Sequence, residues 1–152
     1  MVLATGRKLG CAGDWKENFI RNSQETVLAA RREAATLSLL LEKAPRFTCV
    51  DLETHGEFSV SSPLDHRFLV AGQESELWFT AREVFQKLRL RCELLVAAMC
   101  HSGRLQVAGG DELLGLLRAF LFAGARSILL YPWVMVDDAA AIFMDKFYKE
   151  KS

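Results

Sequence analysis

The amino-acid sequence predicts an α/β domain built around a mostly parallel sheet. Short β-favouring runs alternate along the chain with longer segments of helical periodicity, which is the order of strands linked by crossover helices. One of these runs, residues 94–99, is apolar throughout, as expected of a strand that is buried on both faces. The chain has 152 residues, of which 51% are hydrophobic and 25% charged, and this is enough for one packed core.

The beginning of the chain is expected to hold a leader and one helix. Residues 1–23 are mixed and interrupted by glycines, so we expect a loose leader followed by a single domain at 24–152. From 24 to 43 the chain lacks Gly and Pro and carries a helical stripe of apolar residues. Ser23 is a suitable N-cap for this helix, and Pro45 is expected to end it.

The middle of the chain predicts a strand, a hairpin and a helix. Residues 47–53 begin with β-favouring residues and are expected to form a strand that ends in the loop Thr54-His55-Gly56. Residues 68–70 and 76–79 are β-like runs separated by a glycine-containing segment, which is typical of a hairpin. The helix expected next covers 81–90.

The last third of the chain predicts two strands and two helices. The apolar run 94–99 ends at Cys100, and an apolar helix over 111–123 is followed by Gly124, a good C-terminal cap residue. The remaining predicted elements are a strand at 127–131 and a helix at 137–149.

Composition and motifs exclude several classes of function. Lys plus Arg and Asp plus Glu both number 19, and a net charge of zero argues against an obligatory nucleic-acid partner. No apolar run reaches the ~18–20 residues of a membrane span, and no signal peptide is recognisable, so we expect a cytoplasmic protein. The four cysteines lack metal-ligand spacing and are expected to be free thiols. Phosphate-binding glycine motifs are missing, so we expect neither metal nor cofactor.

His55 and Cys100 are the candidates for chemistry. Each follows a predicted strand, and the carboxyl ends of parallel strands share one edge of a sheet. If the two strands are neighbours, a cysteine nucleophile and a histidine proton donor meet there, which suffices for thiol acyl transfer. The N–H groups of Gly56 and Cys100 could then hold the oxyanion of a tetrahedral intermediate. In the alternative interpretation Cys100 is a small core residue and His55 is simply solvated.

A series of short segments follows in a definite order and spacing: Thr54–Phe58, Ser62–Leu64, Thr80–Val84, Val96–Gly103, Gly115–Phe120, Ala123–Ser127 and the residues Trp133, Asp137, Met144, Phe147 and Tyr148. In this order and spacing they resemble the CHAT domain, a caspase-like domain associated with tetratricopeptide repeats. The resemblance as a whole covers roughly residues 45–149, about two-thirds of the chain.

The resemblance implies a caspase-like three-layer sandwich and a cysteine endopeptidase of the clan of caspases, gingipains and separases. It implies that Cys100 attacks the scissile carbonyl and that His55 protonates the leaving amine. The implied partners are a protein substrate and a regulatory protein, such as a tetratricopeptide-repeat protein. CHAT domains place strands before the histidine strand, so we expect this chain to lack the first strands and to expose a sheet edge through which it could form a homo-oligomer.

Departures from the family pattern leave alternatives open. Glu53 replaces a small residue, and it would either favour the cationic form of His55 or face solvent at the strand end. Met99 replaces a small residue and adds volume, and His101 stands where the family often has an acid. These departures are compatible with a catalytically inactive caspase-like interaction domain. Asp137 would either bind a basic substrate side chain or complement the N-terminus of the last helix.

Overall fold

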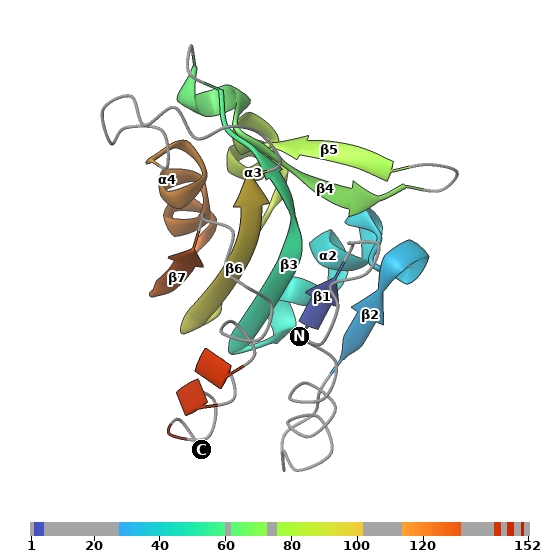
Figure 1. The fold of residues 1–152 in the computed structure, drawn as a ribbon, viewed down its shortest axis with the longest axis vertical. Coiled ribbons are helices and arrows are strands. Elements are labelled where there is room, and N and C mark those ends of the chain that lie inside the picture. Colours follow the sequence, from blue (N-terminus) through green and yellow to red (C-terminus); the bar gives the residue numbers. More distant parts are fainter. Residues whose placement is uncertain are drawn as a thin grey trace.

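The computed structural model describes residues 2–4, 28–59, 62–72, 76–101, 114–131, 142–143, 146–147 and 150. Its centre is a seven-stranded sheet flanked by helices (Figure 1). The strands are β1 (Val2–Ala4), β2 (Ala29–Arg31), β3 (Cys49–Glu57), β4 (Arg67–Ala71), β5 (Glu76–Thr80), β6 (Leu94–His101) and β7 (Ile128–Tyr131). The helices are α2 (Leu37–Lys43), α3 (Ala81–Lys87) and α4 (Leu114–Ala123), with 3-10 turns at η1 (Arg32–Ala34), η2 (Ala44–Arg46) and η3 (Pro63–Asp65).

Five of the strands are mutually parallel and run in the order β2-β1-β3-β6-β7. The hairpin β4–β5 joins them as an antiparallel addition at the far end of β3, where Gly56 pairs with Phe68. The α/β architecture with a mostly parallel sheet is therefore confirmed. The strand order reverses between β1 and β3, and open α/β sheets bind ligands beyond the carboxyl ends of the strands at such a reversal.

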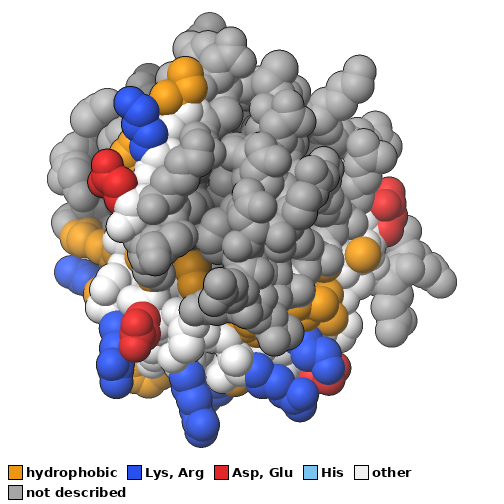
Figure 2. Space-filling model, turned by 90° about the horizontal axis from the view of Figure 1, so that it is seen from below, with side chains coloured by type: hydrophobic (Ala, Val, Ile, Leu, Met, Phe, Trp, Pro, Cys, Tyr) orange, Lys and Arg blue, Asp and Glu red, His pale blue; other side chains and the backbone are white. Residues whose placement is uncertain are grey.

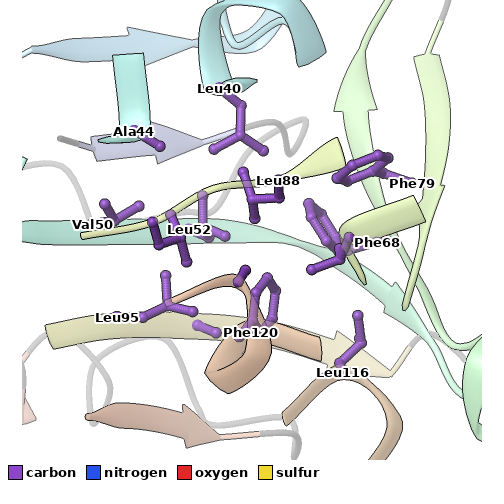
Figure 3. Packing of buried hydrophobic residues seen from close by; sticks show 14 of the residues in the cluster. Leu40, Ala44, Val50, Leu52, Phe68, Phe79, Leu88, Leu95, Leu116 and Phe120 are labelled. Atoms are coloured by element: carbon purple, nitrogen blue, oxygen red, sulfur yellow. The ribbon is translucent and has the colours of Figure 1, made fainter. Parts of the chain in front are cut away.

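The core lies between one face of the sheet and the three α-helices. Leu52 of β3 packs among Leu40 of α2, Leu88 beyond α3 and Phe120 of α4 (Figure 3). Each fully buried side chain of this size contributes about 2 kcal/mol to folding. On the other face of the sheet, Val96 of β6 and Asp51 of β3 are also buried. A sheet covered on both faces is what the expected three-layer sandwich requires.

The helix expected at 24–43 is wrong over residues 29–36. Ala29–Arg31 form β2, and Thr36 is the N-cap of α2, where its Oγ1 accepts a hydrogen bond from the Leu39 N–H at 3.2 Å. Helix propensity is a weak preference, and here the pairing of β2 with β1 overrides it. The end of the helix at Lys43 is as expected.

The open edge expected beside β3 is also wrong. Val2–Ala4 lie within the expected leader, yet they form β1 and pair with Asp51–Glu53 of β3. Strand β2 in turn pairs with β1, so two parallel strands occupy this edge.

The structure also differs from the prediction at Thr54-His55-Gly56, which were expected to form a loop. Strand β3 continues to Glu57, because its last residues pair with β6 on one side and β4 on the other. His55 and Gly56 therefore belong to a rigid strand rather than to a loop. The hairpin, the strand at 94–99 and the strand at 127–131 are confirmed, and none of their bounds shifts by more than two residues.

The helix ends follow local chemistry. Helix α3 is shorter than expected and ends at Lys87, where the Arg89 guanidinium donates to the Leu88 carbonyl at 2.7 Å. Gly124 caps α4 as predicted, with φ of 114° and an Ala125 N–H bond to the Phe120 carbonyl at 3.1 Å. In the last predicted helix, residues 142–143, 146–147 and 150 are helical.

Candidate functional site

His55 and Cys100 occupy paired positions on neighbouring strands. Strands β3 and β6 are parallel and in register from Cys49↔Leu94 to Gly56↔His101, and this register pairs His55 with Cys100. Neighbouring strands lie about 4.8 Å apart. The two strands lie side by side in Figure 1, and their register places His55 beside Cys100 near the carboxyl ends of both. The adjacency on which the predicted dyad depends is present in the backbone.

His55 is the exposed residue in the middle of a buried strand. The five residues before it, from Val50 to Thr54, and Gly56 after it are all buried. The His55 carbonyl accepts a hydrogen bond from Thr54 Oγ1 at 3.5 Å, but the His55 side chain makes no hydrogen bond to any residue that the structure describes. Its ring is accessible to solvent, as a residue that exchanges protons with a substrate must be.

Thr54 fixes the strand beside this histidine. Its Oγ1 donates a hydrogen bond to the Leu69 carbonyl of β4 at 2.6 Å, and both groups are buried. The ladder between β3 and β4 has only two register pairs, which begin at Gly56. The hydrogen bond from the Thr54 hydroxyl thus adds one contact to the short pairing between β3 and β4. The sequence did not predict this role, because a threonine within a strand gives no indication of which carbonyl its hydroxyl group will bond.

Close packing against Met99 favours a glycine at position 56. A Cβ atom there would lie 3.1 Å from the Cβ of Met99, closer than ordinary van der Waals contact. Met99 itself is fully buried and belongs to the core. Since side chains alternate along a strand, Met99 packs on the face of Gly56, opposite to the face of His55. The volume of Met99 therefore does not crowd the histidine, and the oxyanion role of Gly56 stays a prediction.

Glu53 is buried, with only 6% of its surface exposed. The interpretation in which it faces solvent at the strand end is therefore wrong. Asp51 is buried as well, and alternation along β3 places Asp51, Glu53 and His55 on one face of the strand. Buried carboxylates are uncommon in proteins. The burial of Asp51 and Glu53 could not be predicted from the sequence, because acidic residues near the end of a predicted strand are usually exposed.

An ordered charged cluster lies directly beyond His55. Arg67 of β4 donates through Nε and Nη2 to the same oxygen of Glu57, at 2.8 and 2.5 Å, across the register pair of the two residues. The guanidinium also lies over the Trp78 ring, 4.7 Å from its centre. Both charged side chains are about 40% exposed, so the ion pair contributes no more than about 1 kcal/mol. Its main effect is to hold the strand end in place.

His66 is a structural histidine. It is fully buried, its Nε2 lies 3.0 Å from the Ser59 carbonyl, and its ring meets Phe58 edge to face at 5.5 Å. Helix α4 begins against it: a Cβ on Gly115 would lie 2.8 Å from His66 Nδ1 and 1.9 Å from the Pro63 carbonyl oxygen. No side chain larger than hydrogen fits at Gly115. The histidine thus anchors the loop between β3 and β4.

Two other cysteines belong to the scaffold. Cys92 is fully buried and Cys49 half-buried, and both are free thiols as predicted. Burial raises the pKa of the Cys92 thiol, which keeps it protonated and unreactive at neutral pH. Within the described ranges, no three His, Cys, Asp or Glu residues are grouped as metal ligands. None of the described helices has the length and apolarity of a transmembrane segment.

Asp137, the predicted substrate-binding residue, lies outside the described residues, as does Trp133. The backbone of His101 pairs with Gly56.

Comparison with known proteins supports one family. The CHAT domain family model matches residues 17–152, which include every strand from β2 to β7 and both residues of the predicted dyad. The match begins within the expected leader. No match is found among curated proteins. The match covers most of the chain and agrees with the α/β fold and with the resemblance of its segments. The chain therefore belongs to the CHAT domain family, which is caspase-like.

Proposed function

We propose that this protein is a cysteine endopeptidase of caspase-like type that cleaves protein substrates with a His55/Cys100 dyad. The observation that carries the proposal is the register of β3 and β6, which pairs the two residues at the carboxyl ends of adjacent parallel strands. The exposure of His55 within an otherwise buried strand supports it. Family membership supports a peptidase as the class of activity.

The proposed reaction proceeds through an acyl-enzyme. The Cys100 thiolate attacks the carbonyl carbon of the scissile peptide, and the N–H groups of Gly56 and Cys100 stabilise the resulting oxyanion. His55 gives a proton to the leaving amine as the C–N bond breaks. Water then attacks the thioester, releases the carboxylic acid product and regenerates the thiol. Asp137 is proposed to bind a basic side chain that precedes the scissile bond.

The inactive alternative is based on the departures at Glu53, Met99 and His101. One of these carries less weight, because Met99 packs into the core on the face opposite to His55. Regulation by a separate protein, such as a tetratricopeptide-repeat protein, and a cytoplasmic location are part of the proposal.

A peptidyl acyloxymethyl ketone probe tests the chemistry. The full chain is incubated with matched probes that carry Arg or Leu before the reactive group, and the labelled cysteine is identified by peptide mapping. We expect labelling at Cys100 that is abolished in Cys100→Ala and slowed in His55→Ala. Cys92→Ser is the matched control and should label at the wild-type rate, because Cys92 is buried with a raised pKa.

Two results would contradict the proposal. A folded sample in which Cys100 does not react between pH 6 and 9 would overturn the dyad. Equal slowing of both probes by Asp137→Asn would overturn the substrate-binding role of Asp137 alone, because that role predicts loss with the Arg probe only.

A further inference from the structure

Helices α3 and α4 expose an aromatic surface on the side away from the core. The rings of Phe85 and Phe122 contact each other across the two helices, with centroids 5.2 Å apart and planes at 53°. Phe122 is 69% exposed and the adjacent Leu121 is 48% exposed. We call Phe85, Leu121 and Phe122 the aromatic patch. Phe85 is half-buried and packs against the edge of the core, whereas Leu121 and Phe122 lie outside it, on the side of α4 opposite to the fully buried Leu116 and Phe120.

Basic residues surround the aromatic patch. Arg82 lies three residues before Phe85 within α3, and Arg118 lies four residues before Phe122 within α4, so each shares a helical side with a phenylalanine. Arg89 follows the end of α3. Residues 81–93 and 114–127 together contain six Lys or Arg and two Asp or Glu, in a chain whose net charge is zero. In the view of Figure 2, Lys and Arg side chains lie along the lower edge of the described surface, with some Asp and Glu side chains beside them.

Some of these basic side chains already form ion pairs or hydrogen bonds within the chain, and their charge is therefore partly compensated. Arg82 lies 3.6 Å from Asp65, Lys87 bonds Glu83 at 2.8 Å, and Arg89 caps carbonyls at the end of α3. Arg118 is exposed and forms no ion pair within the described part of the chain. It stands one helical turn from the most exposed phenylalanine, so an acidic group could meet it without displacing another partner.

We propose that the aromatic patch binds an acidic amphipathic segment of a partner protein. Aromatic and arginine side chains are the residues that most often dominate binding energy at protein interfaces. Apolar side chains of the partner would cover Phe85 and Phe122, and its carboxylates would meet Arg118 and its basic neighbours. A second copy of this chain suits the surface less well, because a two-fold interface would bring the same basic rim against itself.

A designed peptide tests the proposal without requiring peptidase activity. The probe is a fluorescein-labelled helical peptide of about 16 residues, with Leu and Phe on one side and Glu elsewhere. Its binding to the full chain is measured by fluorescence anisotropy. We expect saturable binding that weakens as salt rises from 0.05 to 0.5 M, because exposed charges are screened. A version with Lys in place of Glu should not bind.

Point variants localise the binding. Phe122→Ala and Arg118→Glu should each weaken it by about tenfold or more, which is typical of central interface residues. Leu64→Ala and Arg46→Glu, which change an exposed leucine and an exposed arginine on 3-10 turns η3 and η2, should leave it unchanged. All four residues are exposed, so the variants should fold, which circular dichroism verifies.

Other outcomes would overturn the proposal. Absence of peptide binding would contradict the proposal of an acidic partner. Equal binding by Arg118→Glu and the wild type would contradict it as well. Self-association in sedimentation experiments that is lost in Phe122→Ala would replace it with a second copy. Binding of vesicles that contain phosphatidylserine, dependent on Arg118 and without peptide binding, would replace it with a membrane surface.

Discussion

His55 and His66 are close in sequence and opposite in environment. His55 is exposed near the carboxyl end of a central strand, next to the position of Cys100, and its side chain makes no hydrogen bond within the described residues. His66 is fully buried, with its Nε2 at the Ser59 carbonyl and its ring against Phe58. A histidine can exchange protons with a substrate only if its nitrogens can reach that substrate. The difference between the two sites is therefore one of accessibility rather than residue type.

Replacing each histidine by alanine is the strongest test of this comparison. His55→Ala should slow labelling or cleavage by about 10²–10⁴-fold, the usual contribution of a general acid or base, and should leave the thermal unfolding temperature nearly unchanged. His66→Ala should instead lower the free energy of unfolding by about 2–4 kcal/mol, because it leaves a buried cavity and removes the contact between the ring and the Ser59 carbonyl. Labelling rates and thermal melts of both variants check this. The opposite assignment of the two effects would break the comparison.

Gly115→Ala tests the surroundings of His66 from the side of α4. The new methyl group would overlap the Pro63 carbonyl and crowd His66, so α4 must shift. We expect a loss of about 3 kcal/mol in the free energy of unfolding, measured by urea denaturation. Arg118→Ala, on the exposed side of the same helix, is the control and should change stability by less than about 0.5 kcal/mol. Similar stability of both variants would show that η3 is not packed tightly against α4.

Thr54→Val tests the strand beside His55. Removing the hydroxyl leaves the buried Leu69 carbonyl without this hydrogen bond, which should cost about 1–3 kcal/mol. Thr54→Ser keeps the donor and should recover most of that loss. Urea denaturation of both variants measures the effect. Equal losses in the two variants would mean that the methyl group, and not the hydrogen bond, stabilises the junction.

The smallest expected effect on stability concerns the N-terminus of α3. The N–H of Ala81, the first residue of this helix, donates a hydrogen bond to the His66 carbonyl at 2.7 Å. Thr80 and Glu83 form a capping box there. Burial acts to raise the pKa of Glu83, but hydrogen bonds from Lys87 and Thr80 outweigh it and lower that pKa below its usual value. A lowered pKa means that the carboxylate stabilises the folded state above its unfolded pKa and loses this effect as pH falls through the folded value.

Glu83→Gln should therefore cost about 0.5–1 kcal/mol near pH 7 and almost nothing at pH 3. Thermal melts of the variant and the wild type at both pH values measure this difference. A cost that is the same at pH 3 and pH 7 would contradict the role assigned to the carboxylate.

The sequence predicted the elements whose pattern is local. The apolar run of β6, the hairpin and the Gly124 cap each depend on neighbouring residues, and each is present. Strand β2 depends instead on pairing with Val2–Ala4, a distant segment with no signature of its own. The alanine-rich stretch that contains it has the composition of a helix, so no local rule could reveal the strand.

The candidate site was predicted in part for the same reason. His55 and Cys100 could be proposed because each follows a β-like run, and their adjacency follows from the register of β3 and β6. The burial of Glu53, the bond from Thr54 to Leu69 and the Arg67–Trp78 contact depend on tertiary neighbours. A sequence read one segment at a time does not contain that information.

The register of β3 and β6 also bears on when the dyad forms during folding. The two strands are separated by the hairpin and α3, so they can pair only after a long chain loop has closed. Contacts between distant segments form slowly compared with local ones. A newly synthesised chain therefore contains the thiol and the imidazole before their two strands are paired. The proposed dyad would become reactive only after this pairing, and recovery of Cys100 labelling after dilution from denaturant would report the moment at which the central pair of strands closes.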